Sequence, residues 1–97
     1  MSLVHLAGTL RCRTAAEAGL LQRHLPDHIR QTRAEPGCIA FDVTPEPGDP
    51  LRWRVREIFI DRPAFLRHQA RSKASPWGLA TAGVLRDWQI RGASDLR

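Results

Sequence analysis

The stretch Thr32-Arg33-Ala34-Glu35-Pro36-Gly37-Cys38 marks the point where a helical pattern gives way to a strand pattern. Proline followed by glycine is a typical signal for the end of a helix. The residues from 38 to 44 then alternate in polarity, which predicts a strand. Upstream of the stretch, residues recur every three or four positions, as the buried face of a helix requires: Leu21, Leu25, Ile29 and Thr32.

The beginning of this helix is also marked in the sequence. Thr14 is followed three residues later by Glu17, a capping box in which each side chain binds a free backbone N–H group. Pro26 lies inside the pattern and has no N–H group to donate, so we expect it to kink the helix or to split it into two pieces.

Strands and helices are predicted on both sides of this unit. The ranges 3–13, 51–60 and 86–91 alternate in polarity, and 45–50 is a turn that contains three prolines. Asp61 and Ser75 are N-cap residues with a proline one or two positions later, so helical segments should begin after each of them.

The resulting order, β-α-β-β-α-β with a divided second helix, predicts an α+β fold of the ferredoxin-like type with an antiparallel sheet. We expect a single domain over residues 1–97, with a core over 3–91 and a polar C-terminal tail. Helices would cover one face of the sheet. The other face also carries apolar residues, so we expect it to be covered by a second copy in a homodimer.

Composition limits the function classes. The net charge is +5, but the arginines are dispersed and Lys73 is the only lysine, so nucleic-acid binding is not expected. No apolar run approaches the ~20 residues of a membrane span, and the first residues read as a strand and not as a signal peptide, which favours a cytoplasmic protein. Cys12 and Cys38 form no metal or disulfide motif and read as small hydrophobic residues.

Several segments together resemble the antibiotic biosynthesis monooxygenase family, which includes quinol monooxygenases. The run from Arg33 to Ile39 resembles the family's signature at the end of its first helix, and Gly48-Asp49-Pro50 resembles the hairpin that follows. Arg56 to Asp61 is similar to the end of the third strand, with phenylalanine where tryptophan is commoner. Ala64 to His68 and Ser75-Pro76-Trp77 resemble the next helix and the step after it.

The resemblance implies a dimeric α/β barrel. It also implies one of several reactions, because the family includes cofactor-independent quinol and anthrone oxygenases, haem-degrading oxygenases and isomerase-like relatives. Arg71 to Ala74 look like an insertion that reshapes the mouth of the family's pocket. Haem is possible but disfavoured, because Gly8 stands where haem-degrading members have asparagine and no histidine follows Trp77. We therefore expect no cofactor and no metal.

His68 is the predicted catalytic residue, because histidine titrates near neutral pH and the matching position in relatives lines the pocket. A structural histidine is the alternative. Trp77 would stack on a flat substrate or fill the core. Glu57 lies among apolar neighbours, where a carboxylate is costly unless paired; it pairs with an arginine or acts as an acid or base. The remaining predicted substrate-binding residues are Arg71, Ser75, Trp53, Phe59 and Gly8. As alternatives, Trp53 and Phe59 would form the dimer core, and Arg71 and Ser75 would be solvated.

Three other histidines have no assigned role. His24 and His28 are four residues apart, a spacing that can bind a metal, but Pro26 disturbs the helix that would align them. His5 lies on the polar side of the first strand. The expected partners are therefore a small aromatic molecule and O2. The rival functions are an O2-independent isomerase, cyclase or degradative enzyme, and a dimer that binds a ligand without catalysis.

Overall fold

The structure is a computed structural model and describes residues 2–92. Four strands and three helices follow one another in the predicted order. Their bounds are β1 (Val4–Arg11), α1 (Ala15–Arg33), β2 (Cys38–Glu46), β3 (Asp49–Phe59), α2 (Arg62–Ala74), α3 (Pro76–Ala80) and β4 (Leu85–Arg91).

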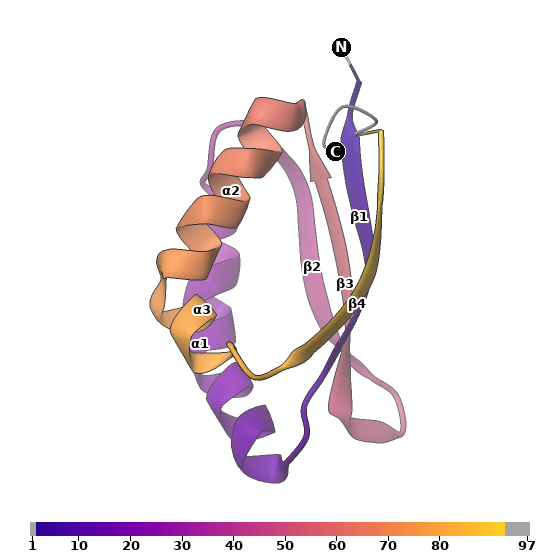
Figure 1. Cartoon of the computed structure of the whole chain (residues 1–97), viewed down its shortest axis with the longest axis vertical. Coiled ribbons are helices and arrows are strands. Elements are labelled where there is room, and N and C mark those ends of the chain that lie inside the picture. The colour runs from indigo at the N-terminus through magenta and orange to yellow at the C-terminus, as the bar shows by residue number, and fades with distance from the viewer. Residues whose placement is uncertain (1, 93–97) are drawn as a thin grey trace.

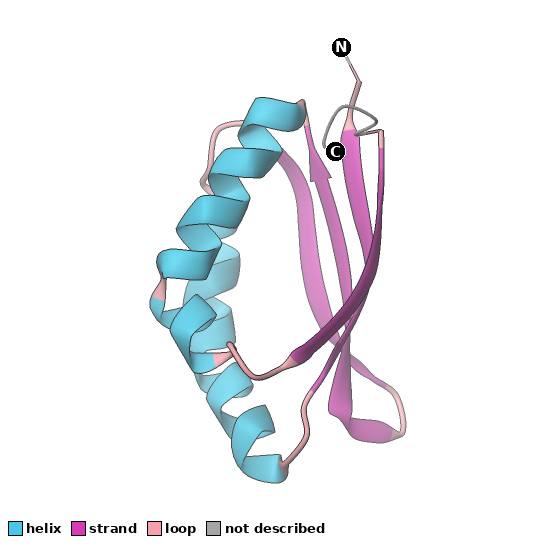
Figure 2. Ribbon diagram, in the orientation of Figure 1, coloured by secondary structure: helices cyan, strands magenta, loops and turns pink. Residues whose placement is uncertain are grey.

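The strands form one antiparallel sheet in the order β2-β3-β1-β4. All three helices pack on the same face of this sheet, and the opposite face has no helix over it (Figures 1 and 2). The predicted ferredoxin-like α+β fold is confirmed. The two central strands, β3 and β1, have neighbours on both sides and form the floor on which the helices lie.

Each predicted cap is present at the beginning of its helix. Thr14 accepts a hydrogen bond from the backbone N–H of Glu17 at 3.1 Å, and Asp61 accepts one from Ala64 at 2.9 Å. Ser75 ends α2 and begins α3, because its hydroxyl donates to the carbonyl of Ser72 and accepts from the N–H of Gly78. These side chains satisfy N–H groups that have no partner within the helix.

Two details differ from the prediction. Of the two outcomes expected for Pro26, a kink or a split, the split does not occur, because α1 runs as one helix from Ala15 to Arg33. The proline-rich turn is also shorter than expected: Pro45 lies in β2 and Pro50 in β3. Strand β2 is at the edge of the sheet, where a proline need not donate to a neighbouring strand. The positive φ of 80° at Gly48 allows the tight reversal that remains.

The helix-facing side of the sheet forms the core. On β3 the predicted alternation is correct, since Trp53, Val55, Glu57 and Phe59 are all buried. Strand β2 departs from alternation at Ile39, which is exposed because the pairing with β3 shifts between Cys38 and Ala40. The other buried apolar side chains of this core are Val4, Leu6, Leu10, Cys12, Ala18, Leu21, Phe41, Val43, Ala64, Phe65, Trp77 and Val84.

Gly8 lies where two strands approach each other closely. A Cβ atom at this position would lie 2.2 Å from the carbonyl oxygen of Asp87 and 2.5 Å from the Cα of Trp88. A side chain on residue 8 would therefore push β4 away from β1. The glycine thus sets the position of Trp88, whose ring lies beside the cavity described next.

Candidate active site

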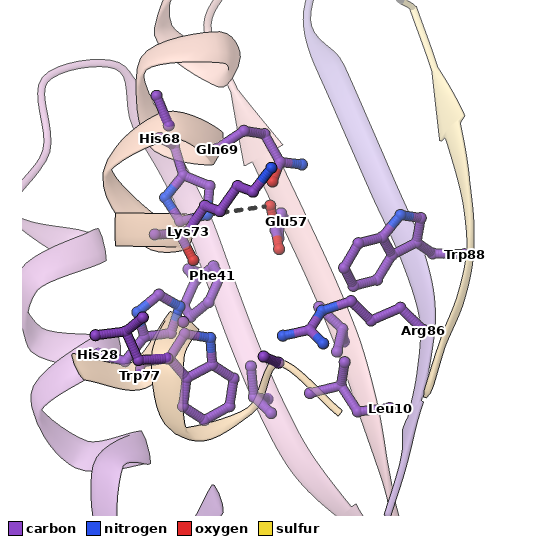
Figure 3. Close-up of a pocket in the computed structure, with 17 residues that line it drawn as sticks. Leu10, His28, Phe41, Glu57, His68, Gln69, Lys73, Trp77, Arg86 and Trp88 are labelled. Atoms are coloured by element: carbon purple, nitrogen blue, oxygen red, sulfur yellow. Dashed lines mark ion pairs between the residues drawn. The ribbon is translucent and has the colours of Figure 1, made fainter. Parts of the chain in front are cut away.

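A cavity of about 620 Å³ lies between the sheet and the α2–α3 segment. Its wall is mainly apolar and aromatic, with a few polar side chains that point inward (Figure 3). This composition is typical of a site for a small organic molecule. The residues that line it are Leu10, His28, Phe41, Val43, Val55, Glu57, His68, Gln69, Ala70, Ser72, Lys73, Trp77, Gly78, Leu79, Ala82, Arg86 and Trp88.

His68 is held rigidly on the inner side of α2. Its residue is only 2% exposed, and its ring stacks on Phe59 with centroids 4.9 Å apart. The edge of Phe41 lies against it, with centroids 5.6 Å apart. Burial lowers the pKa of His68, and the hydrogen bond to Glu35 opposes that shift without cancelling it. His68 is therefore mostly neutral at neutral pH and can accept a proton.

The two ring nitrogens of His68 face two different carboxyl groups. Nδ1 lies 2.7 Å from Oε1 of Glu35, within hydrogen-bond distance. Nε2 lies 3.6 Å from Oε1 of Glu57, which is too far for a hydrogen bond. Figure 3 shows this second contact as a dashed line on the cavity wall. A hydroxyl group of a ligand in the cavity could contact both Nε2 and Glu57 from one side of this pair.

Glu57 projects from β3 into the apolar interior. Its Oε1 has no hydrogen-bond partner within residues 2–92, so the charged form loses its hydration without compensation. Burial, with a smaller effect from the negative charge of Glu35, raises the pKa of Glu57 to about 7. The carboxyl group therefore exchanges a proton near neutral pH. Of the two roles predicted for it, pairing with an arginine is not observed, because it faces His68 instead.

Glu35 connects His68 to Arg71. Its second oxygen, Oε2, accepts a hydrogen bond from Nε of Arg71 at 2.7 Å. Burial raises the pKa of Glu35, but the hydrogen bonds with Arg71 and His68 outweigh burial, and the pKa lies below its ordinary value. Glu35 is thus a carboxylate at neutral pH. Arg71, predicted as a substrate-binding residue, is turned toward α1 and away from the cavity.

A second buried histidine supports the tryptophan of the cavity. The ring of His28, from α1, stacks on Trp77 with centroids 4.6 Å apart and an angle of 5° between the planes. Burial, together with the nearby charges of His68, Arg71 and Arg86, lowers the pKa of His28 to about 3. His28 is therefore a neutral ring at physiological pH. One face of Trp77 is occupied by this ring, while its indole borders the cavity (Figure 3).

Arg86 supplies a positive charge at the rim. Its guanidinium donates to the carbonyl oxygens of Thr81 and Val84 and to the hydroxyl of Thr81, at 2.8 to 2.9 Å. It also lies 5.9 Å from the ring centroid of Trp88. Guanidinium has five N–H groups, so these three bonds leave two for a ligand. Among the described residues no carboxylate forms an ion pair with Arg86, and its charge remains available to an anion.

The structure brings three of the predicted site residues together on the cavity wall: His68, Glu57 and Trp77. The others lie outside the wall as it is defined over residues 2–92. Phe59 supports His68 from behind, and Trp53 fills the core. Ser75 caps α3, Arg71 binds Glu35, and Gly8 lies where β4 approaches β1.

Sequence reasoning missed four notable wall residues. Phe41 could have been found, since it alternates with Val43 on the face that also carries Trp53. His28 lies seven residues after Leu21 and so continues the predicted buried face of the helix. Arg86 and Trp88 gave no signal of their own. Their position depends on how β4 docks beside β1, which is a feature of the tertiary structure.

Between residues 2 and 92, no group of three or more histidine, cysteine, aspartate or glutamate side chains is arranged to hold a metal ion. In the same range, no helix is long and apolar enough to cross a membrane.

Comparison with known proteins gives a family and a set of structural relatives. The family profile described as antibiotic biosynthesis monooxygenase matches residues 3–75, about three quarters of the chain. No curated protein matches the sequence at a significant level.

Three solved structures share the fold. SnoaB, a cofactor-independent oxygenase from Streptomyces nogalater, superposes with a TM-score of 0.78 at 14% identity, over 96% of this chain and 94% of SnoaB. A candidate antibiotic biosynthesis monooxygenase from Caulobacter crescentus gives 0.80 at 18% identity, over 95% and 90%. A protein from Pseudomonas aeruginosa gives 0.74 at 23% identity, over 93% and 90%. At such low identity these likenesses establish the fold alone.

Proposed function

Because the chain belongs to the antibiotic biosynthesis monooxygenase family, we propose that it is a monooxygenase that uses no cofactor and acts on a flat, quinol- or anthrone-like aromatic molecule. The observation that carries the proposal is the placement of a buried base, His68, beside a carboxyl group on the wall of an aromatic cavity. SnoaB, which has the same fold, is a cofactor-independent oxygenase.

The cavity suits a flat ring with an acidic hydroxyl group. Trp77, Phe41 and Trp88 offer aromatic surface around a space of about 620 Å³. The hydroxyl would bind beside Nε2 of His68 and Glu57, whose buried Oε1 lacks a hydrogen-bond partner among residues 2–92. Arg86 lies on the opposite side of the cavity in Figure 3, where its charge would stabilise the substrate anion.

In the first step, His68 takes the hydroxyl proton. The proton moves from the substrate oxygen to Nε2, which leaves an electron-rich anion on the ring and a charged imidazolium on the protein. Removal of water from the cavity strengthens each electrostatic contact with that anion. The protein thus lowers the barrier to reaction with O2 by binding, orienting and deprotonating the substrate.

The substrate itself reduces O2 in the steps that follow. A ring carbon of the anion forms a C–O bond with O2 to give a hydroperoxide, whose second oxygen takes up the proton. The C–H bond on the same carbon and the O–O bond then break, so that the proton and the leaving hydroxide form water and a carbonyl group remains. In sum the substrate loses two hydrogens and gains one oxygen, and the other oxygen atom appears in water.

Oxygen consumption with hydroquinones, anthrones and naphthols tests the proposal. The wild type should consume O2 and place one atom of oxygen-18 gas in the product, while His68→Gln should lose about a hundredfold or more in rate. His24→Gln is the matched control, since His24 lies outside the cavity wall. Equal rates and the same product without O2 would refute the proposal.

A second candidate function is supported by the same pair of groups. Glu57 can donate a proton near neutral pH and the neutral His68 can accept one, which is the requirement of an isomerase or cyclase. That function predicts turnover that is independent of O2 and still depends on both residues. If quenching of tryptophan fluorescence shows that a ligand binds and no turnover is detected, a non-catalytic ligand-binding protein would be favoured instead.

We also propose that two copies associate through the uncovered face of the sheet. Ala7 and Thr9 lie on this face in a shallow groove, opposite Arg56 and Arg54 of β3. Small residues at the centre of an uncovered sheet allow a second sheet to approach closely. Light scattering should give the mass of a dimer for the wild type and of a monomer for Ala7→Arg. A monomeric wild type at micromolar concentration would contradict this proposal.

A further inference from the structure

We infer that Glu35, clamped by Arg71, is a positioning residue that keeps the proton of His68 on Nδ1 and leaves Nε2 free toward the cavity. The inference rests on the proposed function in one respect, because it explains how His68 becomes the base. It adds two residues that lie outside the cavity wall and touch no substrate. The arrangement is that of a base oriented by a third group, as in other catalytic triads.

Two side chains of α2, those of His68 and Arg71, hold Glu35, which lies in the loop after α1, and each contacts one of its two oxygens. Oε1 receives His68 Nδ1 at 2.7 Å, and Oε2 receives Nε of Arg71 at 2.7 Å. His68 and Arg71 are three residues apart on α2, so both side chains leave the same face of the helix. With each oxygen directed at a different donor, the carboxylate has little freedom to rotate.

Arg71 is itself fixed to the end of α1. One terminal nitrogen donates to Oγ1 of Thr32 at 2.9 Å, and the other donates to Oε1 of Gln31 at 3.2 Å. Thr32 is fully buried. The guanidinium thus ties α2 to α1 and places a permanent positive charge beside Glu35. This charge keeps Glu35 ionised, so it acts as an acceptor.

The identity of the acceptor decides the tautomer of His68. An ionised carboxylate can only accept, so Nδ1 must carry the hydrogen. A neutral imidazole has one N–H, so Nε2 then carries the lone pair. The charged or titratable groups that face this ring are Glu35, Glu57, Arg71 and His28. Only Glu35 is within hydrogen-bond distance of it among the described residues.

The same contact assists the base during the reaction. When Nε2 takes a proton, the imidazolium that forms already donates to a carboxylate at 2.7 Å. The positive charge is then stabilised without any movement of the protein. In Glu35→Gln the amide keeps the size of the side chain and loses the charge, so both the preference for one tautomer and the stabilisation of imidazolium should weaken.

Nuclear magnetic resonance of protein with nitrogen-15-labelled histidine tests the inference without any substrate. The His68 signals, assigned by their loss in His68→Gln, should show a protonated Nδ1 and an unprotonated Nε2 in the wild type. In Glu35→Gln this tautomer should no longer dominate, and the ring should become harder to protonate. Glu46→Gln, which removes a carboxylate on the outer face of the sheet, is the matched control and should leave the His68 signals unchanged.

Kinetics supply the second readout. Glu35→Gln should lower kcat by more than about tenfold with little change in KM, and should shift the acidic limb of the kcat/KM profile to lower pH. A wild-type His68 protonated on Nε2, or His68 signals unchanged in Glu35→Gln, would overturn the inference even if His68 is needed for turnover. Conversely, the expected tautomer without any O2 consumption would refute the proposed function and leave the positioning role intact.

Discussion

The burial of Glu57 predicts a pH dependence of stability that a single substitution should remove. The pKa of Glu57 rises from its ordinary value of 4.5 to about 7 in the folded protein. The folded state therefore binds a proton more tightly than the unfolded state does. Stability is highest below the unfolded pKa and is lost as pH rises from about 4.5 to about 7.

The size of the effect follows from the shift. Each pKa unit corresponds to about 1.4 kcal/mol, so a shift from 4.5 to about 7 corresponds to about 3 kcal/mol between pH 4 and pH 8. Glu57→Gln keeps the shape of the side chain and cannot ionise. As pH rises from 4 to 8, the wild type should therefore lose about 3 kcal/mol of unfolding free energy relative to Glu57→Gln.

Urea unfolding followed by tryptophan fluorescence, at a fixed protein concentration, measures this difference at each pH. Glu46→Gln is the matched control. Its carboxylate is paired with Arg54 at the surface, which lowers the pKa of Glu46, so its difference should change in the opposite sense. A difference for Glu57→Gln that does not vary with pH would refute the reasoning. It would mean that folding leaves the pKa of Glu57 unchanged, whereas a carboxylate paired with a charged His68 would give a change in the opposite sense.

Three further predictions concern the cavity and its supports. Burial lowers the pKa of His28 from 6.5 to about 3, so the wild type loses stability as pH falls below 6.5. Between pH 7 and pH 4, the unfolding free energy of His28→Phe, measured with urea, should therefore fall by about 3 kcal/mol less than that of the wild type. Gly8→Ala should destabilise by about 1–3 kcal/mol because its Cβ would meet Asp87, whereas Gly19→Ala, on an open helix surface, should stabilise by about 0.5–1 kcal/mol; thermal melts compare the two. Arg86→Gln should weaken binding of an anionic aromatic ligand more than that of its neutral analogue, as measured by quenching of tryptophan fluorescence.

Much of the fold could be predicted because its signals are local. The caps Thr14, Asp61 and Ser75 each act on an N–H group a few residues away, so the sequence alone reveals them. The alternation along β3 likewise placed Glu57 on the buried face. Pro26 left two outcomes open, a kink or a split, and α1 is not split. The packing of α1 on the sheet stabilises the helix in spite of the hydrogen bond that the proline cannot form.

The site was predicted less completely because its parts meet only in the tertiary structure. Arg71 looked free near the mouth of a pocket, but its partner Glu35 lies 36 residues away in the chain. Arg86 was predicted only as the first residue of a strand, and it reaches the cavity rim through the docking of β4 on β1. No local pattern in the sequence predicts either contact. His68 was accessible to prediction because a family resemblance marked its position.

The cavity has a floor and a roof that differ in how freely they can change. Its floor is the sheet, where Val55 and Glu57 are held in register by strands on both sides. Its roof is the short α2–α3 segment, which includes Lys73 and Leu79. Substitutions in this segment would alter the shape of the cavity without disturbing strand pairing. A library for laboratory evolution of substrate range should therefore vary Lys73 and Leu79 and keep Gly78, where a Cβ would lie 2.2 Å from a backbone carbonyl oxygen.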